Sequence, residues 1–172
     1  MIPQIKKILY ATDLTKNSAY AFYFASDLAQ KNDAQIVILH SIEPISAQVY
    51  LEAGSEGEAA MRRGREGARQ DDVAEIKTHL EEFCRKVESQ TGLPCASLVS
   101  DVIVKEGYPV EEILNTADEK ECDVIVLGTH GKGWLSREFL GSVARSVIER
   151  TRKPTFLIPL PSDKGAIDWG AL

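Results

Sequence analysis

The sequence predicts an α/β fold with a five-stranded, mainly parallel sheet of the Rossmann-like, doubly wound kind and helices on both faces. Two observations predict it. Short apolar runs alternate with longer segments in which apolar residues recur every three or four positions, the spacing of a helix with one buried face. The central runs are continuously apolar, as expected of strands covered on both sides. Strands that alternate with helices form parallel sheets through right-handed crossovers.

The individual elements follow from these periodicities and from their start and stop signals. Strands are expected over residues 5–11, 34–41, 96–105, 123–127 and 155–160. Helices are expected over residues 17–31, 73–90, 110–121 and from about 142 to 152. Either Thr15 or Asn17 is expected to cap the first helix. Gly92 and Pro94 should end the second helix, and Pro109 suits the first turn of the third.

The 172-residue chain is long enough to form one domain with a sizeable core. We expect one domain over residues 1–161, with a flexible loop insertion at 45–72 and a polar C-terminal tail at 162–172. The insertion is rich in glycine and charge, which leaves little apolar surface to order it. Its arginines, Arg62 to Arg69, are candidates for a lid over a bound anion.

Composition restricts the partners and the compartment. A net charge of −6 argues against nucleic acid and anionic membranes. No apolar run approaches the roughly 20 residues of a membrane helix, and the N-terminus has no signal-peptide core. The three cysteines, Cys84, Cys95 and Cys122, form no Cys-x-x-Cys pair. These features predict a cytoplasmic protein with reduced thiols and no zinc site.

The stretch from Gly128 to Val143 is the strongest candidate site. Gly128, Gly131 and Gly133 lie within six residues, directly after an apolar strand, and Gly141-Ser142 opens the next helix. Glycine permits close approach of the backbone to a ligand, and a helix N-terminus offers unpaired N–H groups and a positive dipole end. Ligands of parallel sheets bind beyond the carboxyl ends of the strands. The stretch therefore predicts a phosphate site.

Two common nucleotide signatures do not match this stretch. In the P-loop pattern, Gly128-x4-Gly133 would be followed by a lysine and a hydroxyl residue, but Trp134 follows. The dinucleotide pattern would need a third glycine where Ser136 stands after Gly131-x-Gly133, and it would follow the first strand rather than the fourth.

Two further classes of protein with a related fold do not match the sequence either. A phospho-receiver domain needs an aspartate at the end of strand three and a lysine at the end of strand five. Here these strands end in Val104-Lys105-Glu106 and Ile158-Pro159-Leu160. An adenylyl- or phosphoryl-transfer enzyme would show a catalytic histidine pair or a Ser-Gly-Gly loop, and neither is present.

The spacing Gly128-x2-Gly131-x9-Gly141-Ser142 resembles that of the universal stress protein family. The resemblance covers the chain from Ile5 to Leu160. It is supported by further residues at the ends of the expected strands: Asp13, His40, Glu43-Pro44, Gly107, Pro109, Leu127 to Gly131 and Lys153-Pro154.

The resemblance implies the ATP-binding branch of that family. The implied nucleotide-binding residues are Thr12, Asp13, His40, Leu127, Gly128, Thr129, Gly131, Gly133, Gly141, Ser142 and Val143. In the family, the glycines approach the ribose and phosphates, the start of the last helix binds phosphate, and the residue at His40 contacts adenine mainly through its backbone. Asp13 would also help to place Mg²⁺. Leu14 departs from the family, because many members have glycine or another small residue there.

The expected function is that of a cytoplasmic universal stress protein that binds ATP and acts as a nucleotide-dependent stress-response homodimer with an unidentified protein partner. The resemblance implies that the strand from Thr155 to Leu160 pairs across the dimer axis, and an apolar edge strand favours such pairing. Hydrolysis needs a positioned base and a charge clamp on the γ-phosphate, which the sequence does not reveal. No catalytic residue is assigned, and ATPase activity should be slow at most. The alternative is a nucleotide-independent homodimeric interaction module.

Overall fold

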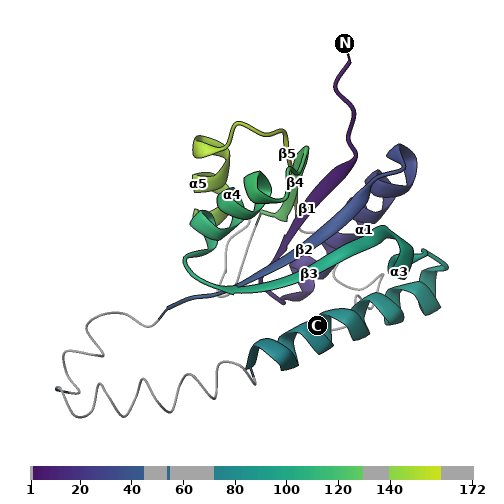
Figure 1. Ribbon diagram of the computed structural model, residues 1–172, viewed down its shortest axis with the longest axis horizontal. Helices are drawn as coiled ribbons and strands as arrows, with labels where there is room; N and C mark the ends of the chain where they lie inside the picture. The colour runs from purple at the N-terminus through teal and green to yellow at the C-terminus, as the bar shows by residue number, and fades with distance from the viewer. Residues whose placement is uncertain (1, 45–53, 55–71, 130–139, 160–172) are drawn as a thin grey trace.

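The computed structural model describes residues 2–44, 54, 72–129 and 140–159. Five strands form one sheet in the order β3-β2-β1-β4-β5, and every neighbouring pair is parallel (Figure 1). The strands are β1 (Lys7–Thr12), β2 (Gln35–Ile42), β3 (Val99–Glu106), β4 (Val124–Gly128) and β5 (Thr155–Ile158). The predicted five-stranded parallel sheet is confirmed.

Helices cover both faces of the sheet, so the doubly wound prediction is also confirmed. The described part of the chain contains the helices α1 (Lys16–Asn32), α3 (Cys95–Leu98), α4 (Pro109–Glu119) and α5 (Ser142–Arg150). A further helix spans residues 72–91. In Figure 1, α4 and α5 lie together on one side of the sheet. They share one core cluster, whereas α1 and the 72–91 helix share the other.

Alternating side chains of the central strands enter these two clusters. In β1, Ile8 and Tyr10 pack against α1, and Leu9 packs against α4 and α5. All three side chains are fully buried. A strand with two buried faces is apolar throughout, which is the physical reason for the continuous apolar runs in the sequence.

The prediction of a strand over residues 96–105 is wrong at its start. Residues 95–98 form the short helix α3, and β3 begins only at Val99. Pro94 initiates this turn, since its carbonyl accepts hydrogen bonds from the amides of Ser97 and Leu98. Cys95 and Leu98 are the buried residues of the helix. The sequence Cys-Ala-Ser-Leu has no β-branched residue, so little opposes a helical turn here.

The sheet has a topological switch point between β1 and β4. The chain places β2 and β3 on one side of β1, and then crosses to place β4 and β5 on the other. The connections that leave β1 and β4 therefore diverge, which opens a crevice at the carboxyl ends of these two strands. Ligands of open α/β sheets bind at such points.

Candidate functional site

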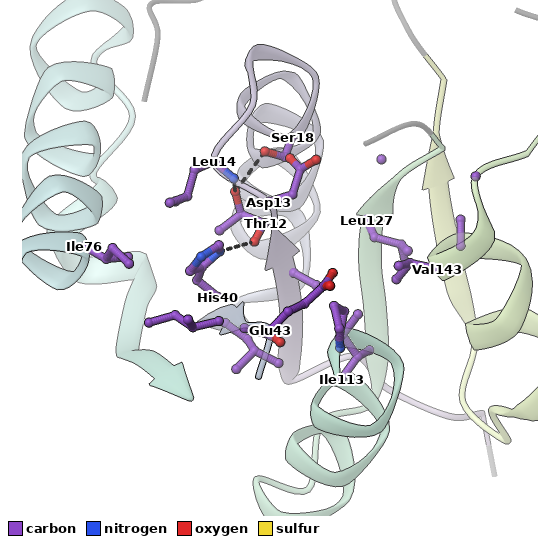
Figure 2. Close-up of a pocket in the computed structure, with 18 of the residues that line it drawn as sticks. Thr12, Asp13, Leu14, Ser18, His40, Glu43, Ile76, Ile113, Leu127 and Val143 are labelled. Atoms are coloured by element: carbon purple, nitrogen blue, oxygen red, sulfur yellow. Dashed lines mark hydrogen bonds between the residues drawn. The ribbon is translucent and has the colours of Figure 1, made fainter. Parts of the chain in front are cut away.

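A cavity of about 850 Å³ lies at the carboxyl ends of β1, β2 and β4 (Figure 2). Its volume is within the range of small-molecule sites. Nine of the eleven residues that the sequence predicted for nucleotide binding line it: Thr12, Asp13, His40, Leu127, Gly128, Thr129, Gly141, Ser142 and Val143. The other two, Gly131 and Gly133, lie outside the described residues, as do the 62–69 arginines. The fold thus brings four separate chain segments together around one cavity.

The segment Thr12 to Ser18, called the β1–α1 corner below, is a closed hydrogen-bond network. The hydroxyls of Thr12 and Ser18 are 2.8 Å apart, and Ser18 Oγ donates to the carbonyl of Thr15. The Thr12 hydroxyl is therefore the donor of the pair, and its oxygen also accepts from Leu14 N. Thr15, rather than Asn17, is the N-cap of α1 and accepts from Ser18 N. The polar groups of this corner mostly bind one another.

Asp13 differs from the other polar residues of that corner, because only one of its two carboxylate oxygens is hydrogen-bonded within the described residues. Its Oδ1 accepts from both the backbone N–H and the hydroxyl of Thr15, at 3.0 and 2.6 Å. Its Oδ2 is buried and has no hydrogen-bond partner among the described residues. A buried carboxylate oxygen without a donor is costly, and such an atom marks a place for a ligand or cation. Asp13 lines the cavity, so its open oxygen belongs to the site.

Leu14, the position at which the sequence departs from its family, has φ of 64°. This left-handed conformation brings Cβ close to the backbone in every residue except glycine and costs roughly 1–2 kcal/mol. A glycine at this position would adopt it freely. The turn after β1 therefore favours a glycine at this position, and this chain forms it with a strained leucine.

His40 joins the ends of two strands. The ring is 7% exposed, and its Nδ1 lies 2.8 Å from the carbonyl oxygen of Thr12, its register partner in β1 (Figure 2). Because a carbonyl only accepts, Nδ1 carries the hydrogen. The ring thereby holds the β1 and β2 ends together at the cavity wall. Nearby, burial raises the pKa of Tyr10 well above its ordinary value, and its hydroxyl donates to Ser18 O.

The β4–α5 corner, defined as Leu127 to Thr129 with Gly141 to Val143, is built differently. Gly141 is the N-cap of α5, makes no side-chain cap, and donates its own N–H to Thr129 O at 2.8 Å. That N–H is therefore already used. The amides of Ser142 and Val143 belong to the first turn, where no intrahelical acceptor exists. This corner offers backbone donors to the cavity.

Sequence reasoning missed one wall of the site. The first turns of the 72–91 helix contribute Asp72, Glu75 and Ile76, and the end of β2 contributes Glu43. Figure 2 shows Ile76 facing the strand ends from across the cavity. The periodicity of the helix identified Ile76 only as a core residue, because nothing local reveals that the helix passes the strand ends.

The lining is acidic in the part of the chain that the structure describes. Four carboxylates line the cavity, and no lysine or arginine of the described segments does so. No group of three or more His, Cys, Asp or Glu residues in those segments could hold a metal ion by itself. A cation at this site would therefore share its coordination with a ligand.

Comparison with known proteins agrees with these features. The model of the universal stress protein family matches residues 4–159. The chain belongs to the universal stress protein family. Among relatives, it is 30% identical over 156 residues to universal stress protein MJ0531 of Methanocaldococcus jannaschii, covering 91% of this chain and 83% of the relative. Universal stress protein MJ0577 of the same organism is 28% identical over 157 residues, covering 89% and 94%.

Solved structures of universal stress proteins share the fold. The structure of MJ0577 matches with a TM-score of 0.64 at 24% identity, over 94% of this chain and all of that one. A universal stress protein family protein from Arabidopsis thaliana, solved with AMP bound, matches with a TM-score of 0.56 at 16% identity, over 95% and 97%. Among residues 2–44, 72–129 and 140–159 of this universal stress protein, no helix has the length and apolar character of a membrane span.

Proposed function

We propose that this universal stress protein binds ATP, together with Mg²⁺, in the cavity at the carboxyl ends of β1, β2 and β4. The observation that carries the proposal is the convergence of nine predicted residues on one cavity of nucleotide-compatible size. The AMP found on the Arabidopsis thaliana relative supports an adenine nucleotide as the ligand class.

The phosphates are proposed to lie at the β4–α5 corner. The first-turn amides of Ser142 and Val143 have no acceptor within the helix and lie at its positive end, and both residues line the cavity. Gly141 has a different role, because its N–H is bonded to Thr129. The absence of a side chain at Gly141 is proposed to leave room for the phosphates beside the helix entry. Gly131 and Gly133 are proposed to complete this end of the site.

The Mg²⁺ is proposed to bind between the phosphates and Asp13. Asp13 Oδ2 is a buried carboxylate oxygen without a partner among the described residues, and carboxylate oxygen is the ligand type that Mg²⁺ takes. The described lining adds three more carboxylates, from Glu43, Asp72 and Glu75. A free triphosphate would be repelled by these charges, so a divalent cation reduces the repulsion as well as bridging the two partners.

The proposed role is nucleotide-dependent regulation rather than turnover. Rapid phosphoryl transfer needs a cation fixed near the γ-phosphate and a positioned base. The described lining contributes no such cation. We therefore propose slow ATPase activity at most, in a cytoplasmic stress-response protein whose nucleotide occupancy changes its interaction with a protein partner. The binding domain is proposed to span residues 1–161, with 45–72 as a loop insertion and 162–172 as a tail.

The homodimer is proposed to form through β5, within the predicted strand from Thr155 to Leu160. Among the described residues, β5 lies at one edge of the sheet and pairs with β4 alone. Phe156 on this edge is 46% exposed. An apolar edge strand is a template for pairing, and two-fold symmetry is the commonest outcome. Light scattering should give twice the chain mass for the native protein and the chain mass for Phe156→Asp.

The deciding experiment is extraction of bound nucleotide from natively purified protein, followed by calorimetry with ATP in the presence and absence of Mg²⁺. Adenine nucleotide in the extract and saturable, Mg²⁺-enhanced binding are expected. The variant Asp33→Asn, which removes a carboxylate outside the cavity, is the control, because Asp33 is fully exposed at the C-terminus of α1. An empty extract together with flat titrations would exclude the proposal and favour the nucleotide-independent interaction module.

A further inference from the structure

The cavity has an apolar part on the side of β2, across β1 from the β4–α5 corner. Ile42 ends β2, Pro109 begins α4, Ile76 belongs to the 72–91 helix, and all three line the cavity. Figure 2 shows Ile76 on one side of the β1 end and Leu127 and Val143 on the other. Apolar side chains suit a planar base, whereas phosphates suit the backbone donors of a helix start. On the proposed function, the base therefore lies on the β2 side.

Glu43 brings a carboxylate to this apolar part. It lines the cavity, and within the described residues its carboxylate makes no hydrogen bond or ion pair. The chain is fixed just before it, because Gly107 N donates to Ile42 O at 3.0 Å and Ser41 Oγ donates to Gly107 O at 2.7 Å. Figure 2 shows Glu43 near His40 at the end of β2. An acceptor is thus held at the apolar part of the cavity, ready for a donor on a ligand.

We propose that Glu43 determines base specificity at this site, by accepting a hydrogen bond from the exocyclic amine of an adenine base. The inference rests on the proposed function, since it requires a nucleotide with its base on the β2 side. An ionised carboxylate only accepts hydrogen bonds, and the adenine amine is a donor. Hydrogen bonds with an ionised partner are stronger than neutral ones. The protein should therefore prefer purines that carry this amine.

Three other carboxylates line the cavity, and their positions distinguish them from Glu43. Asp13 lies at the end of β1, where its Oδ1 accepts two bonds from Thr15. Asp72 and Glu75 come from the 72–91 helix rather than from a strand end. Glu75 is the matched control for Glu43, because it has the same side chain, is also exposed, and lines the same cavity from a different element.

The test compares ATP with purine riboside triphosphate, in which hydrogen replaces the amine, by calorimetry on the full chain with Mg²⁺. The native protein should bind ATP about tenfold more tightly. Glu43→Ala should bind the two nucleotides within about twofold of each other, and Glu75→Ala should keep the tenfold preference of about the native size. The ratio of affinities is the readout, because loss of a negative charge changes the affinity for both triphosphates alike.

Glu43→Gln adds a readout that a merely structural role would not change. Inosine triphosphate has a carbonyl in place of the amine, and the glutamine amide can donate to that oxygen whereas a carboxylate cannot. The native preference for ATP over inosine triphosphate, about tenfold, should fall to about twofold in this variant. Glu43 is exposed, so thermal unfolding should show both variants within about 1 °C of the native protein.

The outcomes separate this inference from the proposed function. No binding of either nucleotide by the native protein would exclude both. Binding of ATP and purine riboside triphosphate with equal affinity by the native protein would overturn the base specificity alone. Retention of the native preference by Glu43→Ala, or its loss in Glu75→Ala instead, would also overturn the role of Glu43 while leaving nucleotide binding established.

Discussion

The helix N-termini at the two corners of the cavity differ in whether a side chain caps them. At the β1–α1 corner, the Thr15 side chain caps α1 and the Thr12 and Ser18 hydroxyls bind each other. At the β4–α5 corner, α5 has a glycine at the N-cap and no side-chain cap. Both helices start at the same edge of the sheet, and both starts contribute residues to one cavity. A capped terminus has its donors satisfied, whereas an uncapped one must find acceptors elsewhere.

On the proposed function, the β1–α1 corner stabilises the fold and the β4–α5 corner binds the ligand. The β1–α1 corner has one acceptor, Asp13 Oδ2, without a partner among the described residues. The β4–α5 corner has two donors, the amides of Ser142 and Val143, without an acceptor inside α5. A magnesium–phosphate ligand has complementary groups for both. Apart from Asp13, substitutions in the β1–α1 corner should therefore mainly change the free energy of unfolding, and those in the β4–α5 corner should mainly change the affinity for nucleotide.

The largest effect is expected for Gly141→Val. Gly141 has φ of −58° and ψ of 152°, which any L-residue adopts without strain. The variant should therefore fold with an unchanged melting temperature. Its branched side chain would occupy the space beside the helix entry, and loss of the charge-assisted bonds there should weaken ATP binding about 100-fold. Calorimetry and thermal unfolding measure the two quantities. A folded variant with native affinity would contradict the placement of phosphate at this corner.

A smaller effect, about tenfold in affinity with Mg²⁺, is expected for Asp13→Asn. The amide oxygen can still accept the two bonds from Thr15, so the turn should persist while the charge on Oδ2 is lost. With EDTA the native protein and the variant should bind ATP equally weakly. The exposed Asp33→Asn variant removes the same charge outside the site. An equal loss of affinity with and without Mg²⁺ would show that Asp13 acts without a cation.

Thr15→Ala and Ser142→Ala form a matched pair at the two helix starts. Thr15→Ala removes the α1 cap and should cost about 1 kcal/mol, lowering the melting temperature by about 2–4 °C. Ser142 is exposed and caps nothing, so Ser142→Ala should leave the melting temperature within about 1 °C. It should instead weaken ATP binding about fivefold through the lost hydroxyl. The reverse pattern would mean that the roles of the corners are exchanged.

The smallest effect is expected for Leu14→Gly. Relief of the left-handed strain, roughly 1–2 kcal/mol, should offset the lost packing of the leucine and the added entropy of the unfolded chain. The net change in the free energy of unfolding should be within about 0.5 kcal/mol. Leu14→Ala keeps the strain and loses the packing, so it should cost about 1–2 kcal/mol. Urea denaturation distinguishes them, and equal destabilisation would show that no strain is stored at this turn.

Much of the fold was accessible from the sequence because it depends on local periodicity. Continuous apolar runs predicted β1, β2 and β4, and Pro109 marked the start of α4 where the structure has it at the first helical position. The start of β3 was not predicted, since α3 depends on the burial of Cys95 and Leu98 against other elements. Strand propensity in a neighbouring run cannot reveal a single helical turn that tertiary contacts stabilise.

The candidate site, like the fold, could be predicted from the sequence only where it depends on local pattern. Glycine spacing and strand ends in the sequence predicted Thr12, Asp13 and the β4–α5 corner, because loops at the carboxyl ends of parallel strands meet wherever the chain carries them. The acidic wall with Glu75 and Ile76 comes from a helix whose path over the sheet no local pattern encodes.

By itself, then, the sequence determined the parallel sheet, its helices and the polar residues at its switch point, since these follow from periodicity and from the few backbone geometries that glycine and proline impose. Only the tertiary structure decided that Gly141 donates its amide to Thr129, and that one oxygen of Asp13 has no partner among the described residues. Such contacts depend on the packing of segments far apart in the chain, and local sequence does not determine them.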